Sequence, residues 1–227
     1  MGSDDSGAAA GPLRFALLGP VRAWRGERVL DLGAPRQRSV AAVLLLGRGR
    51  PVARDQLVRA VWGEPAPAYA VPQLQKYVSA LRRVLEPERS PRSPSGVLNW
   101  SASGYVLDVG PDGIDAAAFE RGVGRGRAAR ARGDAEGAAE ELRAALALWH
   151  GPDAPALSDV TSGFLDTERD RLAELRAAAL EERVQADLDL GRHQEVVPEL
   201  MRLVGDFPLR ERFAGLLMLA LYRCGRQ

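Results

Sequence analysis

The clearest periodic pattern in the sequence covers residues 72–85. Its apolar side chains recur three and four positions apart, which places them on one face of an α-helix; they are Leu74, Tyr77, Val78, Leu81, Val84 and Leu85. The opposite face carries amide, hydroxyl and cationic groups from Gln75, Lys76, Ser79 and Arg83, with Arg82 on the flank. Pro72 fits the first helical turn, where a missing N–H costs no hydrogen bond. The stretch is predicted to bury one face and expose the other.

The exposed face of this helix has two interpretations. Amide side chains can pair with adenine edges, and cationic side chains can pair with guanine edges or neutralise phosphate, so the face suits a helix in the DNA major groove. It equally suits an ordinary surface helix with a solvated basic face. The segments around the helix have to decide between the two.

Those segments indicate a small α+β domain. Before the helix we predict strands at 13–21 and 28–32 with a turn at 24–28, then helices at 35–46 and 54–62 that each end at a glycine. After it we predict a loop at 86–96 and a hairpin at 97–109, in whose turn Gly104 can supply a positive φ. This order is that of a winged helix-turn-helix, whose third helix reads the major groove and whose hairpin wing reaches the flanking DNA.

The second half of the chain is predicted to be all helix, with segments at 115–132, 134–149, 164–190, 192–204 and 209–224. Asp134 is a candidate cap, and Pro198 implies a kink or a late start in its helix. Leu190-Gly191-Arg192-His193 recurs as Cys224-Gly225-Arg226-Gln227, a spacing of 34 residues that matches the tetratricopeptide period. Stacked helical hairpins of this kind usually bind proteins. Because the last apolar helix lacks an obvious cover, we expect a fragment of a longer protein.

The net charge also changes sign between the predicted α+β domain and the predicted helical half of the chain. Residues 12–110 hold 15 basic and 7 acidic residues, a net charge of +8, whereas residues 111–227 hold 16 and 21, a net charge of −5. A basic half indicates a polyanionic partner. We therefore divide the chain into a disordered head at 1–12, a DNA-binding domain at 13–110 and a helical domain at 111–227.

Several classes of protein are excluded by what the sequence lacks. It contains one cysteine, so we expect no disulfide framework and a reducing compartment. It contains no signal segment and no spanning apolar run, which predicts a cytoplasmic protein without a membrane partner. His150 and His193 are not at metal-ligand spacing, the glycines at 122–126 are not a P-loop, and no catalytic constellation stands out. We predict no enzymatic activity, no cofactor and no metal.

With these elements in place, the chain closely resembles the Streptomyces antibiotic regulatory proteins. The resemblance runs from about Leu13 to the last residue, and its motifs are specific in combination rather than singly. They are LLGPVRAWRG (17–26), APRQRSVAAVLLL (34–46), RDQLVRAVWGEPAP (54–67), LQKYVSALRRVL (74–85), GYVLDV (104–109), ALALWHGPDAPALSDV (145–160), LEERVQADLDLGRH (180–193) and FPLRERFAGLLMLALYRCGRQ (207–227). LGPVRAWRG resembles the subgroup of large regulators in which ATPase and repeat domains follow this region.

The resemblance implies an OmpR-type winged helix followed by a bacterial transcriptional activation domain, in an activator of antibiotic gene clusters. Members of the family are understood to bind direct repeats beside the −35 element as tandem dimers and to contact RNA polymerase, including its sigma factor. The polymerase contact would lie in the loop at about 63–71, with Glu64 and Tyr69 as candidates. The sequence departs from the family pattern at Pro72, at Trp100 in the wing and at Pro198.

The candidate DNA contacts fall into three groups. The helix at 72–85 contributes Gln75, Lys76, Ser79, Arg82 and Arg83; the start of the first helix contributes Arg36 and Arg38; the wing turn contributes Ser101 and Ser103. Tryptophans 24, 62 and 149 have apolar neighbours that favour core positions over stacking on bases, whereas the role of Trp100 is left open between the two. The alternative function is a tetratricopeptide-like protein-interaction adaptor whose winged domain no longer binds DNA.

Overall fold

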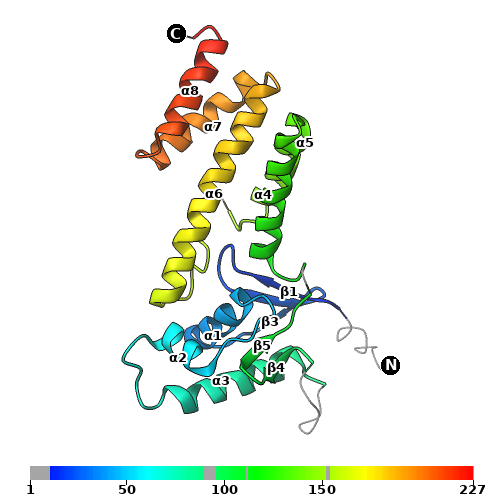
Figure 1. The fold of residues 1–227 in the computed structure, drawn as a ribbon, viewed down its shortest axis with the longest axis vertical. Coiled ribbons are helices and arrows are strands. Elements are labelled where there is room, and N and C mark those ends of the chain that lie inside the picture. Colours follow the sequence, from blue (N-terminus) through cyan, green and yellow to red (C-terminus); the bar gives the residue numbers. More distant parts are fainter. Residues whose placement is uncertain (1–10, 89–95, 111, 152–153, 227) are drawn as a thin grey trace, which may run out of the picture. The chain divides into compact units, whose positions relative to one another are not determined.

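The elements of the fold are seen in a computed structural model that describes residues 11–88, 96–110, 112–151 and 154–226 (Figure 1). The first elements are β1 (Leu13–Ala16), β2 (Arg22–Arg25), β3 (Arg28–Leu30), α1 (Pro35–Leu46), α2 (Arg54–Trp62), α3 (Ala70–Leu85), β4 (Leu98–Ser101) and β5 (Gly104–Leu107). Five helices follow: α4 (Asp115–Ala131), α5 (Ala135–Leu146), α6 (Gly163–Asp189), α7 (His193–Asp206) and α8 (Glu211–Arg223).

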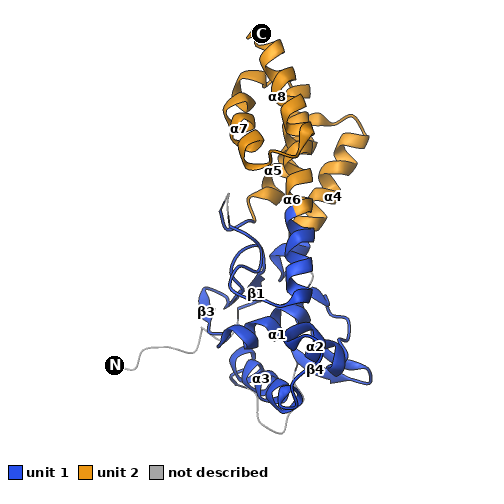
Figure 2. Cartoon of the chain, turned by 90° about the vertical axis from the view of Figure 1, so that its left-hand side faces the viewer, with its two compact units in different colours: residues 1–118, 149–173 blue, residues 119–148, 174–227 orange. Residues whose placement is uncertain are grey.

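These elements form two compact units that interleave in sequence (Figure 2). Unit 1 consists of residues 1–118 and 149–173, and unit 2 of residues 119–148 and 174–227. The α+β elements all lie in unit 1, and α4 and α6 contribute residues to both units. The boundary predicted at residue 111 divides the chain once along the sequence. In the structure, residues 149–173 also belong to unit 1.

The N-terminal sheet corrects one prediction. The strand predicted at 13–21 ends at Ala16, and residues 22–25, partly assigned to a turn, form a second strand that runs antiparallel to it, with Leu13 opposite Arg25. The backbone between the two strands forms hydrogen bonds with distant segments of the chain instead. The N–H groups of Leu17 and Leu18 donate to the carboxylate of Asp115 at 2.7 and 3.1 Å, and their carbonyls accept from Leu157 and His150. Burial raises the pKa of the Asp115 carboxyl, against the lowering effect of these hydrogen bonds.

The helices of unit 1 agree closely with the sequence pattern. α1 and α2 have the predicted bounds, and α1 is buried on all sides from Ser39 to Leu45. α3 buries the predicted stripe at Leu74, Val78, Leu81 and Leu85, with Tyr77 and Val84 half-buried. It begins at Ala70 rather than at Pro72, so the loop before it covers only residues 63–69. Pro72 is the third residue of the helix, where no intrahelical N–H bond is lost.

The hairpin of β4 and β5 forms where it is predicted, and it is tied to the α1–α2 connection. Ser101 pairs with Gly104 across the turn. The backbone N–H and carbonyl of Tyr105 exchange hydrogen bonds with Val52 at 3.0 and 2.9 Å. A Cβ at Gly104 would lie 2.2 Å from the Val52 carbonyl oxygen, so only glycine allows this approach.

Three helices in the second half of the chain share one kind of C-terminal end. Gly133, Gly191 and Gly225 all have φ between 70° and 81°, and the residue after each donates its N–H to a carbonyl five residues earlier. Three helices, α4, α6 and α8, therefore end in the same left-handed cap. The recurrence at residues 190 and 224 thus has a structural counterpart. Asp134 caps α5 as predicted, through the N–H of Gly137. Pro198 lies inside α7, which does not start late.

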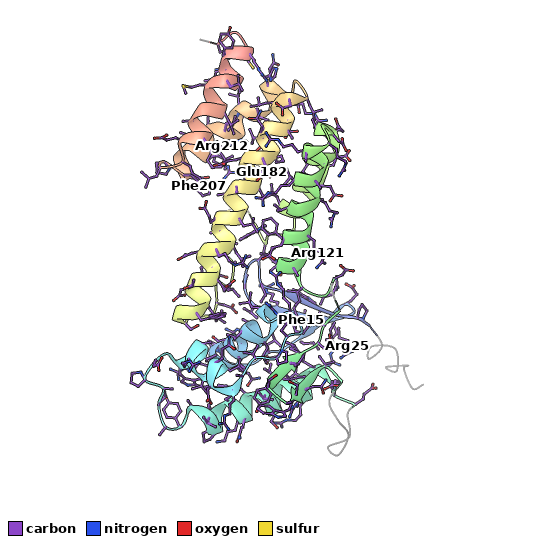
Figure 3. The ribbon with its side chains drawn as sticks, in the orientation of Figure 1. Phe15, Arg25, Arg121, Glu182, Phe207 and Arg212 are labelled. Atoms are coloured by element: carbon purple, nitrogen blue, oxygen red, sulfur yellow. The ribbon has the colours of Figure 1, made fainter. Side chains whose placement is uncertain are left out.

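The long helix α6 is covered on two sides within unit 2. Val184 and Leu188 belong to a core with residues of α7 and α8, while Ala186 packs with Ala129, Ala138 and Ala139 of α4 and α5. Arg127 of α4 donates to Glu182 of α6, which is labelled in Figure 3. None of the helices in the described ranges is long and apolar enough to cross a membrane.

A buried carboxylate links three of these helices. Asp187 of α6 is 3% exposed. Its carboxylate accepts hydrogen bonds from Arg143 of α5 at 2.9 Å, from Arg183 of α6 at 3.1 Å and from Arg192, the N-cap of α7, at 3.0 Å. Glu136 and Glu199 neutralise two of the arginines further out. The three guanidinium groups compensate the desolvation of the carboxylate, and the network fixes how α5, α6 and α7 pack.

We expect Asp187→Ala to lower the free energy of unfolding of unit 2 by about 3–5 kcal/mol, because removing one member of a buried ionic network leaves the others uncompensated. Denaturant unfolding followed by helix content measures this loss. Asp189→Ala, an exposed aspartate on the same helix bonded to Gln185, is the matched control and should change stability by about 0.5 kcal/mol or less. Equal losses in the two variants would contradict the role of the network.

Candidate nucleic-acid interface

The outer face of α3 is exposed and, among the described residues, has a single weak internal contact. Gln75, Lys76, Ser79 and Arg83 are all exposed. Within the described part of the chain, the side chains of Gln75, Lys76 and Ser79 make no hydrogen bond or ion pair, and Arg83 makes only a long contact of 3.5 Å to the Ser79 carbonyl. The sequence of α3 contains no acidic residue. The helix therefore presents amide, hydroxyl and cationic groups that are available to a ligand.

Arg82, the fifth candidate on this helix, points elsewhere. It is half-buried, and its Nε donates to the carbonyl of Leu98 in β4 at 2.9 Å. The guanidinium therefore joins the recognition-helix candidate to the wing. This hydrogen bond anchors α3 to β4, and we therefore leave Arg82 out of the contact surface.

Two further groups hold the C-terminal end of α3. Arg25 of β2, labelled in Figure 3, donates to the carbonyl of Leu85, one of the last carbonyls of the helix. Glu86 accepts from the N–H groups of Gly96 and Val97 at 2.6 and 3.2 Å, which brings the chain back into β4. A cation at a helix C-terminus also interacts favourably with the helix dipole. Sequence reasoning missed Arg25, because nothing local to it signals a contact with a carbonyl 60 residues away.

The N-terminal half of α3 is held by apolar packing. Tyr77 stacks on Trp62, the last residue of α2, with ring centroids 6.2 Å apart and planes at 12°. Leu74 and Val78 are buried beside it. Since both ends of α3 are fixed, the orientation of its outer face is determined by unit 1 itself.

The wing candidates differ from each other. The hydroxyl of Ser101 donates to the Gly104 carbonyl at 3.3 Å and accepts from the N–H of Ser103 at 3.4 Å, so it closes the hairpin turn. Ser103 is exposed. Trp100, which the sequence leaves open, is 56% exposed and lies edge-on to Tyr105.

The two arginines of α1 also differ. Arg36 is exposed and has no partner within the described residues. Arg38 forms an ion pair with Asp159 at 2.8 Å and donates to the Gly33 carbonyl at 2.5 Å. Asp159 also accepts from the N–H of Val21, so Arg38 belongs to an internal network of unit 1. Arg36 stays in the candidate interface and Arg38 does not.

The loop before α3 presents a second surface. Glu64 and Tyr69, the candidate polymerase contacts, are both exposed, and Tyr69 is 56% exposed despite its size. Among the described residues, no group of three or more acidic, histidine or cysteine side chains is arranged to hold a metal ion.

Comparison with known proteins matches both halves of the chain. Residues 28–107 match the family described as transcriptional regulatory protein, C terminal, and residues 114–227 match the bacterial transcriptional activator domain. Regulatory protein AfsR of Streptomyces coelicolor is 43% identical over 219 residues, which are 96% of this chain and 21% of AfsR. Regulatory protein DnrI of Streptomyces peucetius is 36% identical over 94% of this chain and 79% of DnrI. The chain thus spans about a fifth of AfsR and most of DnrI.

A solved structure extends the similarity to the fold. Mycobacterium tuberculosis EmbR, in complex with a low affinity phosphopeptide, superposes with a TM-score of 0.86 at 33% identity over 94% of this chain and 55% of the EmbR chain. The winged α+β elements followed by the helical elements are common to both.

The neighbours Arg82 and Arg83 should behave differently when replaced. Arg82→Ala removes a charged donor from the Leu98 carbonyl, and we expect it to lower the free energy of unfolding by about 1–3 kcal/mol. Arg83→Ala removes an exposed side chain and should change it by about 0.5 kcal/mol or less. Denaturant unfolding of the two variants measures both values; the reverse order would contradict the positioning role of Arg82.

Proposed function

Because the chain belongs to the Streptomyces antibiotic regulatory protein family, in which an OmpR-type DNA-binding domain precedes a bacterial transcriptional activator domain, we propose that it activates promoters by reading direct repeats with α3. Both matched families are those of transcriptional regulators. DNA binding is assigned to residues 13–110 and activation to residues 111–227. The target genes are antibiotic or other secondary-metabolite clusters, as the family membership implies.

The observation that carries the proposal is the outer face of α3. Within the described residues, the exposed polar side chains of this face have no internal partner beyond the 3.5 Å contact of Arg83, so they are available to an external ligand, and the two cations favour a polyanion. Gln75 and Arg83 have the donors and acceptors that read adenine and guanine edges. Lys76, Arg36 and Ser103 are exposed, and we assign them to the DNA backbone.

Reading of direct repeats implies a particular assembly. Two copies bound to direct repeats must have the same orientation, so they meet head to tail rather than through a two-fold axis. Half-sites about one helical turn apart place both α3 helices on the same side of the duplex. The protein would then occupy its promoter as a tandem homodimer.

The loop at 63–69 is assigned to RNA polymerase holoenzyme, including its sigma factor. Glu64 and Tyr69 are exposed in the loop that precedes α3. When α3 lies in the major groove, they would lie beside the helix and not between it and the DNA. An exposed tyrosine of this size is suited to a protein contact, because its ring contributes large apolar area together with a hydroxyl.

DNA binding by the chain should be specific and strongly dependent on salt. Affinity measured by fluorescence anisotropy should be higher for a promoter duplex with direct repeats than for a scrambled duplex, and should fall as salt rises. Lys76→Ala should reduce the slope of log affinity against log salt by about 1 per protomer.

The matched control for Lys76 is Arg130→Ala, which removes an exposed cation of α4 in unit 2. This variant should leave the slope unchanged. Equal affinity for the two duplexes at physiological salt would contradict specific recognition and favour the adaptor alternative.

The polymerase assignment is tested separately. In reconstituted transcription with purified holoenzyme, a variant with both Glu64→Ala and Tyr69→Ala should lose most activation while its DNA affinity stays within about twofold, well under the tenfold that 1.4 kcal/mol represents. Val29→Ala changes an equally prominent apolar side chain on β3 and serves as control. Full activation by the double variant would remove the loop from the polymerase contact.

A further inference from the structure

Trp100 is a large apolar side chain that unit 1 leaves uncovered. It lies on β4, on the same side of the hairpin as Leu98, which is fully buried. Its side chain is nevertheless 56% exposed. An exposed indole lacks the free energy that its burial would contribute, and a ligand that covers it recovers part of that free energy.

The indole is held rigidly although it is exposed. Trp100 is directly opposite Tyr105 in the hairpin, and the two rings meet edge to face with centroids 4.7 Å apart and planes at 79°. Tyr105 itself is 8% exposed and is fixed by its two backbone hydrogen bonds to Val52. A side chain already fixed in this way loses little conformational entropy when a ligand covers it.

Trp100 lies on the hairpin that is tied to the helix carrying the proposed DNA surface. Leu98, two residues earlier on β4, accepts the hydrogen bond from Arg82 that ties the wing to the last turns of α3. Arg83 and Ser79 lie on those same turns, and Ser103 follows in the wing turn. The side chain therefore lies on the hairpin that is bonded to the C-terminal turns of α3, and Ser103 of the same hairpin is exposed.

We propose that Trp100 packs against a deoxyribose of the DNA backbone next to the groove that α3 enters. This inference rests on the proposed DNA-binding function. The backbone alternates anionic phosphates, which suit the cations of α3, with apolar sugar faces, which suit a flat indole. The hairpin is a short, charge-free element, so its contribution to affinity comes mainly from this apolar contact. Because every nucleotide carries the same sugar, the contact adds affinity without adding sequence preference.

This contact has a signature that separates it from the contacts of the cations. An apolar contact releases no counterions, whereas each cation that neutralises a phosphate contributes to the salt dependence. Trp100→Ala should therefore lower DNA affinity about tenfold at every salt concentration, which corresponds to about 1.4 kcal/mol. The slope against salt and the ratio of affinities for repeat and scrambled duplexes should not change.

The experiment uses the whole chain with a repeat duplex, a scrambled duplex and a duplex with a single half-site. Tyr222→Ala is the control, since Tyr222 is an exposed aromatic side chain of α8 in unit 2 and should not affect binding. Trp100→Phe preserves an aromatic ring beside Tyr105, so the hairpin should stay folded in this variant. Tryptophan emission gives a second readout: DNA should change the emission of the wild-type chain, and Trp100→Phe should abolish most of that change.

Several outcomes would overturn the proposal. Unchanged affinity of Trp100→Ala, or an unchanged emission response in Trp100→Phe, would show that DNA does not reach the indole. A loss confined to the repeat duplex would assign Trp100 to base reading, and a loss on two repeats but not on a single half-site would assign it to contact between neighbouring copies. If the wild-type chain bound none of the duplexes, the proposed function itself would fail, which is distinct from each of these results.

Discussion

The hydrogen bonds at the C-terminal end of α3 are the constraint on which the rest of the interface depends. Arg25 reaches the Leu85 carbonyl from the N-terminal sheet, and Arg82 reaches the Leu98 carbonyl of the wing. Together with the stacking of Tyr77 on Trp62, they fix the rotation of the helix about its axis. Since successive residues of a helix are about 100° apart, fixing that rotation also fixes which side chains face outward. The three-stranded sheet thus acts as the support of a recognition surface.

Arginine performs opposite tasks in this chain. Arg25, Arg38 and Arg82 satisfy carbonyls or carboxylates inside unit 1, and Arg143, Arg183 and Arg192 surround Asp187 inside unit 2. Arg36 and Arg83 face solvent. A guanidinium has five donors in a planar fork, so it can serve buried acceptors as well as phosphates and guanine edges. The net positive charge of residues 12–110 therefore overstates the charge available to DNA.

What could be predicted from the sequence follows from how local the cause is. The bounds of α1 and α2 were predictable, because apolar periodicity and the glycines at 47 and 63 are local signals. The division of the strand at 13–21 was not, because it depends on Asp115, which is 98 residues from Leu17. The same holds for the candidate site. The outer face of α3 follows from its periodicity, whereas the internal partners of Arg38 and Arg82 belong to other segments of the chain.

The central claim is that the outer face of α3 reads base sequence. Selection of bound duplexes from a randomised DNA library by the wild-type chain and by Arg83→Ala tests it most directly. The wild-type chain should enrich one motif present as a direct repeat, and Arg83→Ala should lose the preference at a single position within each repeat while the spacing persists. Identical motifs from both chains, or no enriched motif from the wild-type chain, would contradict the claim.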